Sequence, residues 1–259
     1  MSGIVSISIQ RFFVIYLLLS IVLVIMKKSN IDQTRLLFVA SMRMTVQLVI
    51  AGFILTYILK NPHPAFTIGY LVAMIAFAIH RVLSKNKELN LRFKIAIGAS
   101  LSVSGIAVVL FFVIAIVNQN IFNPQYTIPL SGMIIGNAMT GVNLGTKTFR
   151  EIVDSERSKI ETLLNFGAKP QHILLPFVNQ ALETAILPTL NSMVGMGIVS
   201  LPGMMTGQIL SGTLPTTAIL YQIAIMIAIC TVVCLSVFGS LYFGYQTLYN
   251  NRNQINYLL

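Results

Sequence analysis

The stretch FKIAIGASLSVSGIAVVLFFVIAIV, residues 93–117, contains a single charged residue, Lys94, near its amino-terminal end. A helix that crosses the hydrocarbon core of a membrane needs about 20 mostly apolar residues, and this stretch meets that requirement. The whole chain has the same character: 56% of its 259 residues are hydrophobic, 9% are charged, and the mean hydropathy is +0.82. Soluble domains carry about 25% charged residues. The composition therefore predicts a membrane protein with several spans and excludes a soluble globular one.

Seven apolar stretches predict an all-α, polytopic membrane protein that forms a single domain over residues 1–259. The first stretch lacks an A-x-A cleavage site and is followed by Lys27 and Lys28, so it is interpreted as a retained span and not as a signal peptide. The predicted spans are 7–26, 36–59, 65–83, 93–117, 127–146, 182–201 and 217–245.

Lysine and arginine alternate between the loops. The rich loops are 27–35, 81–94 and 147–181, and the poor ones are 60–64, 118–126 and 202–216. Because cytoplasmic loops carry the excess of positive charge, this alternation predicts an amino terminus outside the cell and a carboxyl terminus, with Arg252, inside. The same rule accounts for the net charge of +10 without nucleic-acid binding.

The loop 147–181 has an unusual concentration of charge, because residues 147–161 hold four of the seven acidic residues. Thr148 with Glu151, and Ser158 with Glu161, have the spacing of a capping box and predict two helix starts. Gly167 is suited to end a helix and Pro170 to begin the next one. We therefore expect an amphipathic helix, a sharp corner and a second helix, which form a cytoplasmic docking element.

The pattern Glu161-x5-Gly167-Ala168-x-Pro170 resembles the coupling loop of ABC transporter permeases, in which a short helix fits a groove of the ATP-binding subunit. The pair Leu175-Pro176 lies closer to Gly167 in the sequence than the corresponding pair does in the general pattern of ABC importers. The chain is more similar to the FetB/YbbM-type family of iron-export permeases, whose plant relatives are linked to aluminium tolerance. The segments that carry this resemblance are IPLSGMIIGNAMTG (128–141), LNFGAKP (164–170) and ILPTLNSMVGMGIVSLPGMMTGQILSG (186–212).

This resemblance implies the permease subunit of an exporter in the bacterial inner membrane, with a metal ion, iron by resemblance, as cargo. It implies a homodimer that binds two copies of a separate ATPase, and that ATPase would hold ATP and Mg. The chain itself is expected to be non-catalytic and without a cofactor, because GVNLGTKT (141–148) lacks the spacing of a phosphate-binding loop. The implied coupling residues are Glu161, Leu164, Gly167, Ala168 and Pro170.

Other functions stay open at this point. The cargo could be another small solute, such as a nucleotide sugar, or the chain could be an embedded enzyme or an assembly factor. The expected partners are the ATPase, a second copy of the chain and membrane lipid, with no nucleic acid.

Polar or soft side chains within the spans are candidates for the translocation path. They are Arg43, Gln47, Asn137, Glu183 and Met196. Interfacial solvation remains an alternative for Arg43 and Glu183, and apolar packing for Met196. We expect Asn137 to face a dimer interface formed by the fifth and sixth spans.

Glycine and proline positions predict how the spans pack and bend. Two G-x-x-x-G pairs, Gly132/Gly136 and Gly141/Gly145, predict close helix contacts. Pro188 is expected to kink the sixth span and Pro202 to end it, which leaves 202–216 as an outer loop that could gate. No metal site is predicted, because Cys230 and Cys234 have no histidine or acidic residue near them and thioethers prefer soft ions to iron.

Overall fold

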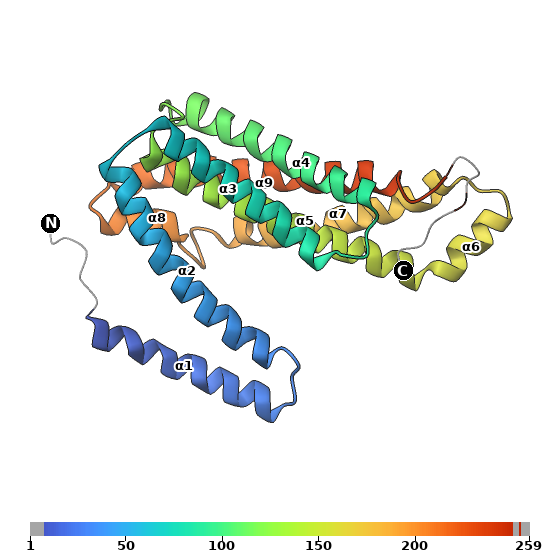
Figure 1. Cartoon of the computed structure of the whole chain (residues 1–259), viewed down its shortest axis with the longest axis horizontal. Helices are drawn as coiled ribbons and strands as arrows, with labels where there is room; N and C mark the ends of the chain where they lie inside the picture. Colours follow the sequence, from blue (N-terminus) through green and yellow to red (C-terminus); the bar gives the residue numbers. More distant parts are fainter. Residues whose placement is uncertain (1–7, 251–253, 255–259) are drawn as a thin grey trace.

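The computed structural model describes residues 8–250 and residue 254, and its regular structure is helical (Figure 1). The only other element in those residues is an isolated bridge between Met196 and Ser200. The helices are α1 (Ile9–Lys28), α2 (Thr34–Lys60), α3 (Pro64–Lys85), α4 (Leu91–Phe111) with a π-helical continuation η1 (Phe112–Ile116), α5 (Pro124–Ser155), α6 (Arg157–Asn165), α7 (Pro170–Gly195), α8 (Gly203–Leu210) and α9 (Pro215–Tyr245). The prediction of an all-α membrane protein is confirmed. Residue 7 of the first predicted span and Arg252 lie outside the described residues.

Four of the long helices begin in the same way, with proline as the first helical residue: Pro64, Pro124, Pro170 and Pro215. Proline is favourable there because its missing N–H would have no partner inside the helix. Asparagine side chains cap two helix starts as well. The Asn90 side chain accepts a bond from the Phe93 amide at 2.7 Å, and Asn123 accepts one from the Gln125 amide at 3.1 Å. The sequence therefore sets these helix starts locally.

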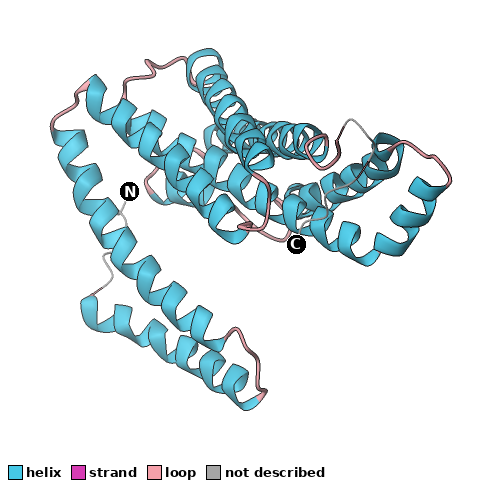
Figure 2. Cartoon of the chain, turned by 45° about the vertical axis from the view of Figure 1, so that its right-hand side comes forward, coloured by secondary structure: helices cyan, strands magenta, loops and turns pink. Residues whose placement is uncertain are grey.

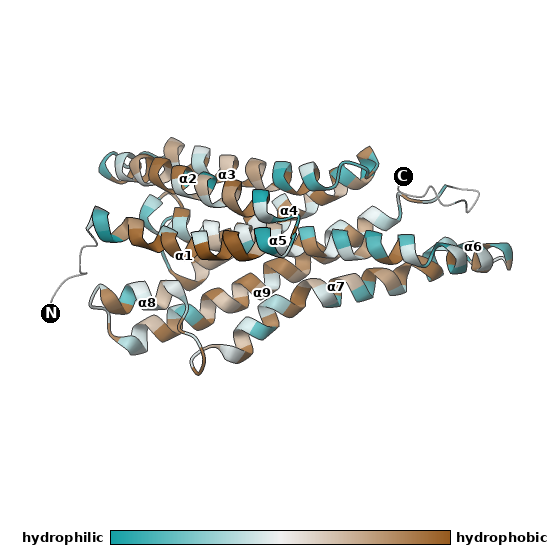
Figure 3. Ribbon diagram, turned by 90° about the horizontal axis from the view of Figure 1, so that it is seen from below, coloured by the Kyte–Doolittle hydropathy of each residue, from teal (hydrophilic) through white to brown (hydrophobic). Residues whose placement is uncertain are grey.

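The described residues form seven long helices, α1, α2, α3, α4 with η1, α5, α7 and α9. They run in alternating directions along the molecule (Figure 1). Six of them, α1, α2, α3, α4 with η1, α7 and α9, are long and apolar enough to cross a membrane. The seventh, α5, is 32 residues long and lies among them, but its composition is more polar. The α3–α4 loop and α6, both in regions rich in lysine and arginine, lie on the same side of Figure 1, whereas the α1–α2 loop lies apart at the tip of its hairpin. Figure 3 shows the hydrophilic residues concentrated on α6 and the adjoining end of α5.

The core forms where α9 packs along α4, α5 and α7, and α5 in turn packs along α3. Its fully buried side chains include Phe93, Ile97, Phe149 and Val237. Burial of a large apolar side chain stabilises a protein by about 1.5–3 kcal/mol in water. In lipid, close packing has to provide much of the helix association instead.

Small residues bring α5 close to α9. A Cβ atom added to Gly141 would lie 2.8 Å from Val233 Cγ1, and one added to Gly145 would lie 2.7 Å from Val237 Cγ1. The other glycine pair has a different environment. A Cβ on Gly132 would lie 3.2 Å from the Met74 side chain, whereas Gly136 faces open space.

Helices α1 and α2 form a hairpin that stands apart from the rest of the bundle (Figure 2). The Tyr16 and Thr45 hydroxyls join the two helices at 2.5 Å. None of the residues in the most apolar window of either helix is buried. Helices that are apolar on every side must be covered by lipid or by protein.

The charged segment departs from the prediction at its start. Helix α5 continues without a break past Thr148 to Ser155, and α6 begins at Arg157, so neither predicted capping box begins a helix. Phe149 and Val153 are the reason, because both are buried and extend the packing face of α5 by two more turns. Tertiary packing thus outweighs the local capping signal.

The sixth predicted span, 182–201, is displaced. Its helix α7 begins at Pro170 and ends at Gly195, and the chain then turns through residues 196–202. Pro202 does not end the span but caps α8, so part of the predicted outer loop 202–216 is helical and contains Gly203 and Gly207. The chain turns at Gly197, whose φ of +82° favours glycine.

The contact between α5 and α9 generates a stability prediction. Gly145→Ala should lower the free energy of unfolding by about 1–3 kcal/mol, because the new methyl group would overlap Val237 and lie 3.3 Å from Ala185 Cβ. The matched control is Gly136→Ala, which enters open space and should leave stability unchanged or slightly higher. Thermal unfolding in detergent measures the difference. Equal melting temperatures for the two variants would contradict this account of the packing.

Candidate functional site

The corner between α6 and α7 is a rigid turn that we call the α6 corner, residues 157–170. Gly167 has a φ of +83°, its amide donates to the Leu164 carbonyl at 2.9 Å, and the Ala168 amide donates to the Leu163 carbonyl at 3.0 Å. These two bonds form a Schellman motif, which satisfies the last carbonyls of a helix. Pro170 then begins α7. The structure confirms the predicted helix, glycine corner and second helix.

The α6 corner is anchored on one side and exposed on the other. Ile160 is fully buried, and Leu164 and Ala168 pack against the core, whereas Phe166 is 85% exposed. Glu161 forms an ion pair with Arg157 at 3.0 Å, and Lys159 forms one with Glu156 at 3.3 Å. Exposed pairs of this kind add little stability, so they leave charge of both signs available to a partner.

A cavity of about 380 Å³ lies between α5, α7 and α9, and we call it the central cavity. Helix α5 contributes Asn137 and Thr140, and α7 contributes Pro188, Thr189 and Ser192. The turn after α7 adds Met196, Ser200 and Pro202, and α9 adds Met226 and Ile229. Gln222 lies one turn before Met226 and donates to the Met196 sulfur at 3.7 Å. The cavity thus combines hydroxyl and amide groups with an apolar wall.

A second cavity, of about 580 Å³, lies nearer α6, and we call it the charged cavity. Lys85, Lys147, Arg150, Glu151 and Asp154 line it, and it shares Thr140 and Leu144 with the central cavity. Lys147 pairs with Glu151 at 3.5 Å, and Arg150 binds Glu88, so the positive and negative charges are largely balanced. The two cavities follow each other along α5.

The residues that α5 presents to these cavities lie on one face of the helix. Asn137, Thr140, Leu144, Lys147, Glu151 and Asp154 recur every three or four residues, which is the spacing of helical neighbours. All but Leu144 are exposed, whereas Gly141 and Gly145 are buried against α9. We call this face the α5 polar stripe.

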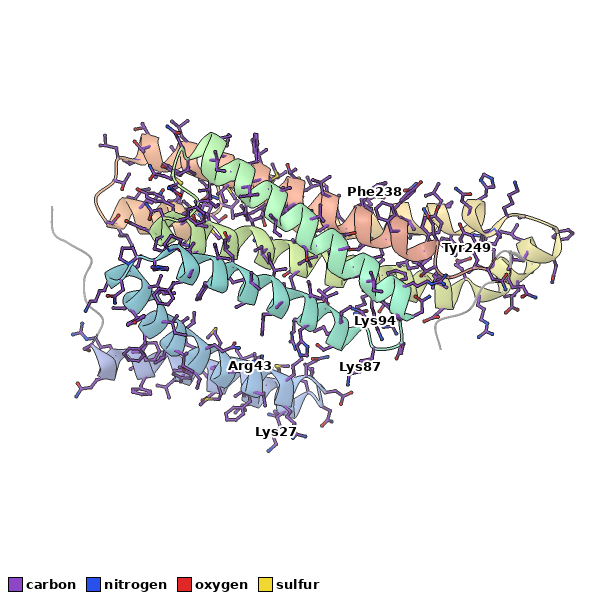
Figure 4. The ribbon with its side chains drawn as sticks, turned by 45° about the horizontal axis from the view of Figure 1, so that its top comes forward. Lys27, Arg43, Lys87, Lys94, Phe238 and Tyr249 are labelled. Carbon is purple, nitrogen blue, oxygen red and sulfur yellow. The ribbon has the colours of Figure 1, made fainter. Side chains whose placement is uncertain are left out.

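Four of the predicted path and gating residues meet at the central cavity: Asn137, Met196, Pro188 and Pro202. The other predicted path residues do not reach it. Glu183 is on the exposed surface of α7, and Arg43 and Gln47 are on α2. Arg43 lies between α2 and α3 (Figure 4), with its guanidinium 5.9 Å from the centre of the Phe77 ring. Figure 4 also shows Lys27 on the hairpin, and Lys87 and Lys94 near the loop between α3 and α4.

Sequence reasoning missed several residues of both sites. Thr140, Thr189 and Ser192 are small polar residues. Nothing in the sequence marks them as cavity residues, because that depends on how the neighbouring helices of the chain pack. Phe166 was part of the LNFGAKP motif, but its exposure depends on the direction of the corner. Cys230 and Cys234 are free and half-buried, and neither lines the central cavity.

The chain is similar to several known membrane proteins, and these similarities extend over most of its length. Residues 9–249 match the model of an uncharacterised protein family, UPF0014. The chain is 31% identical over 254 residues to the UPF0014 membrane protein YjkA of Bacillus subtilis, covering 92% of this chain and 96% of that protein. It is 30% identical over 213 residues to the probable iron export permease protein FetB of Escherichia coli, covering 82% and 81%. It is also 30% identical to the protein ALUMINUM SENSITIVE 3 of Arabidopsis thaliana, covering 82% and 77%. No solved structure matches the chain.

Proposed function

Because the chain belongs to the UPF0014 family of membrane proteins, we propose that it is the permease subunit of an ABC exporter. A separate ATPase subunit would bind ATP and drive transport, and this chain would form the path. The name of the Escherichia coli relative suggests a metal ion, iron, as the cargo.

The α6 corner is the observation that supports this proposal most. It lies at one end of the bundle, its backbone is fixed by the Schellman bonds, and it presents Phe166 beside charge of both signs. An exposed aromatic side chain on a rigid element is a typical anchor for a protein partner. A groove on an ATPase subunit would bury Phe166 and contact Glu161.

Helix α7 connects that docking element to the central cavity. It runs without interruption from Pro170 at the corner to Pro188 and Ser192 at the cavity. Pro176 and Pro188 lie inside α7, and each removes one backbone bond of the helix. A displacement of the corner would therefore be transmitted along α7 and absorbed at these prolines, next to the path.

The α5 polar stripe supports a homodimer. Its exposed amide, hydroxyl and charged groups are unfavourable against lipid, so a second copy of the chain is the natural cover. In such a dimer, the cavities of both copies would face each other and form one path. The close contacts of Gly141 and Gly145 are with side chains of the same chain, mainly those of α9.

The positively charged loops orient the protein in the bacterial inner membrane. The α6 end would face the cytoplasm, where the ATPase is, and the turn 117–123 and α8 would face outward. This orientation also places the charged cavity at the cytoplasmic entrance.

Phe166→Ala should reduce the amount of co-expressed ATPase that co-purifies with the chain by about tenfold, as expected for the loss of one interface anchor. Gly167→Val should do the same, because its backbone conformation is strained for a β-branched residue. Phe122→Ala is the matched control, since Phe122 is an exposed phenylalanine at the opposite end. Equal recovery with all three variants would contradict the assignment of the corner. If the wild-type chain retains no ATPase, an embedded enzyme or an assembly factor becomes the better interpretation.

The dimer proposal makes a prediction for cross-linking. In a background without Cys230 and Cys234, Thr140→Cys and Lys147→Cys should give cross-linked dimers with a bifunctional thiol reagent. Ala138→Cys should give none, because Ala138 is buried inside its own chain. Val103→Cys probes a different face, on α4, where the side chain is 69% exposed. If only the variant at residue 103 forms dimers, the interface involves α4, and the proposed interface on α5 is wrong.

The orientation is tested with reporter fusions after residues 88, 120, 166 and 212. They should report cytoplasm, outside, cytoplasm and outside. A cytoplasmic signal at 120 or 212 would overturn the proposed topology.

A further inference from the structure

The central cavity contains polar groups but no formal charge. None of the described residues that line it is acidic or basic. Glu183, the one acidic residue of α7, lies outside it. A cavity without positive charge gives an anion little stabilisation, and one without carboxylates offers a bare hard cation no charged ligand.

The polar side chains of the cavity offer mainly oxygen atoms as acceptors. Thr140 donates its only hydroxyl hydrogen to the Gly136 carbonyl at 3.0 Å, and Ser192 donates its own to the Pro188 carbonyl at 2.8 Å. Both oxygens can then only accept a bond from a ligand. Asn137 donates one N–H to the Met133 carbonyl at 2.8 Å, and no bond from a described residue occupies its Oδ1.

Pro188 also leaves a backbone acceptor of α7 without its usual donor, next to Ala185, which lines the cavity. Since proline has no N–H, the carbonyl of Thr184 lacks its usual donor within α7. Side-chain groups that are free to donate a hydrogen bond to a ligand are fewer than the acceptor oxygens. They are the hydroxyls of Thr189 and Ser200 and the second N–H of Asn137. A ligand that donates hydrogen bonds therefore fits this cavity better than one that accepts them.

We infer that the central cavity takes its cargo as a hydrated metal cation, held through coordinated water and not by direct protein ligands. This inference rests on the proposed transport function and specifies how that path recognises its cargo. Water bound to a cation donates both of its hydrogens outward, toward oxygens such as those of Asn137, Thr140 and Ser192. Retained water also lowers the cost of moving the charge out of bulk solvent.

The size of the cavity agrees with this mode of binding. Six water molecules at about 30 Å³ each occupy about 180 Å³, and the cavity holds about 380 Å³. The same chemistry disfavours anionic cargo, such as a nucleotide sugar or a metal complex with citrate, whose phosphate or carboxylate oxygens are acceptors.

The test uses inverted membrane vesicles that contain the chain with its ATPase. Transport of Mn²⁺ and Fe²⁺ is measured with and without hexaamminecobalt(III), an ion whose ligands do not exchange and which only donates hydrogen bonds. We expect hexaamminecobalt(III) to compete with the transported ions. Ferric citrate and UDP-glucose should be neither transported nor inhibitory.

Variants identify the residues involved. Thr140→Val removes one acceptor without a change of shape and should raise the KM for the cation about fivefold, the loss expected for one neutral hydrogen bond. Asn137→Asp adds a direct ligand and should lower both KM and kcat, because the ion binds more tightly and leaves more slowly. Asn179→Leu is the matched control on the exposed surface of α7, outside the cavity, and should change neither value.

The possible failures are distinguishable. If cations are transported but hexaamminecobalt(III) does not compete and Asn137→Asp behaves as the wild type, the hydrated-cation inference is wrong and the exporter function stands. Transport of UDP-glucose or ferric citrate in place of cations would overturn the inference as well. If no ATPase is retained, the proposed function itself fails.

Discussion

The close approach of α5 to α9 is the constraint on which the other features depend. Gly141 and Gly145 let the Val233 and Val237 side chains fill the space that larger residues would occupy. Helix α5 is thereby fixed in rotation, with Gly141 and Gly145 toward α9 and its polar stripe on the neighbouring face. The central cavity exists because that rotation places Asn137 and Thr140 opposite Pro188 and Ser192 of α7.

The two candidate sites are joined by one helix. Helix α7 has its first turn in the α6 corner and its last turns at the central cavity, and it also packs against both α5 and α9. A movement at the corner therefore cannot occur independently of the cavity wall. The hydroxyl of Ser192 is bonded to the Pro188 carbonyl, so a change in the bend at Pro188 would also change the position of an oxygen in the cavity.

The sequence predicted the features that depend on local chemistry. Apolar stretches revealed the membrane helices, and the left-handed conformation of Gly167 and the helix start at Pro170 were predictable because only certain residues suit these positions. The end of α5 was not, because Phe149 and Val153 are buried by helices distant in the sequence, and this contact extends α5 through Thr148. The turn at Gly195–Pro202 was missed for a related reason, since glycine and proline within an apolar run fit a kinked helix as well as its end.

The site was predicted only in part. Asn137 and Met196 were recognised because they are unusual within an apolar stretch, and both line the central cavity. Arg43 and Gln47 have the same unusual character, yet the hairpin of α1 and α2 holds them away from it. Which polar residues share a cavity depends on helix rotation and on the separation of the hairpin, and neither can be read from a single helix.

The composition of α5 also bears on how the protein is assembled during synthesis. Each of the other six long helices is apolar enough in composition to cross a membrane, whereas α5, the fifth to be made, is more polar than these six. A helix with so many amide, hydroxyl and charged groups gains little from lipid contact. Its buried face is completed by α9, the last helix of the chain. We therefore expect α5 to remain loosely held by the insertion machinery until α7 and α9 have been translated, so that the helix at the centre of the protein is among the last to settle in the bilayer.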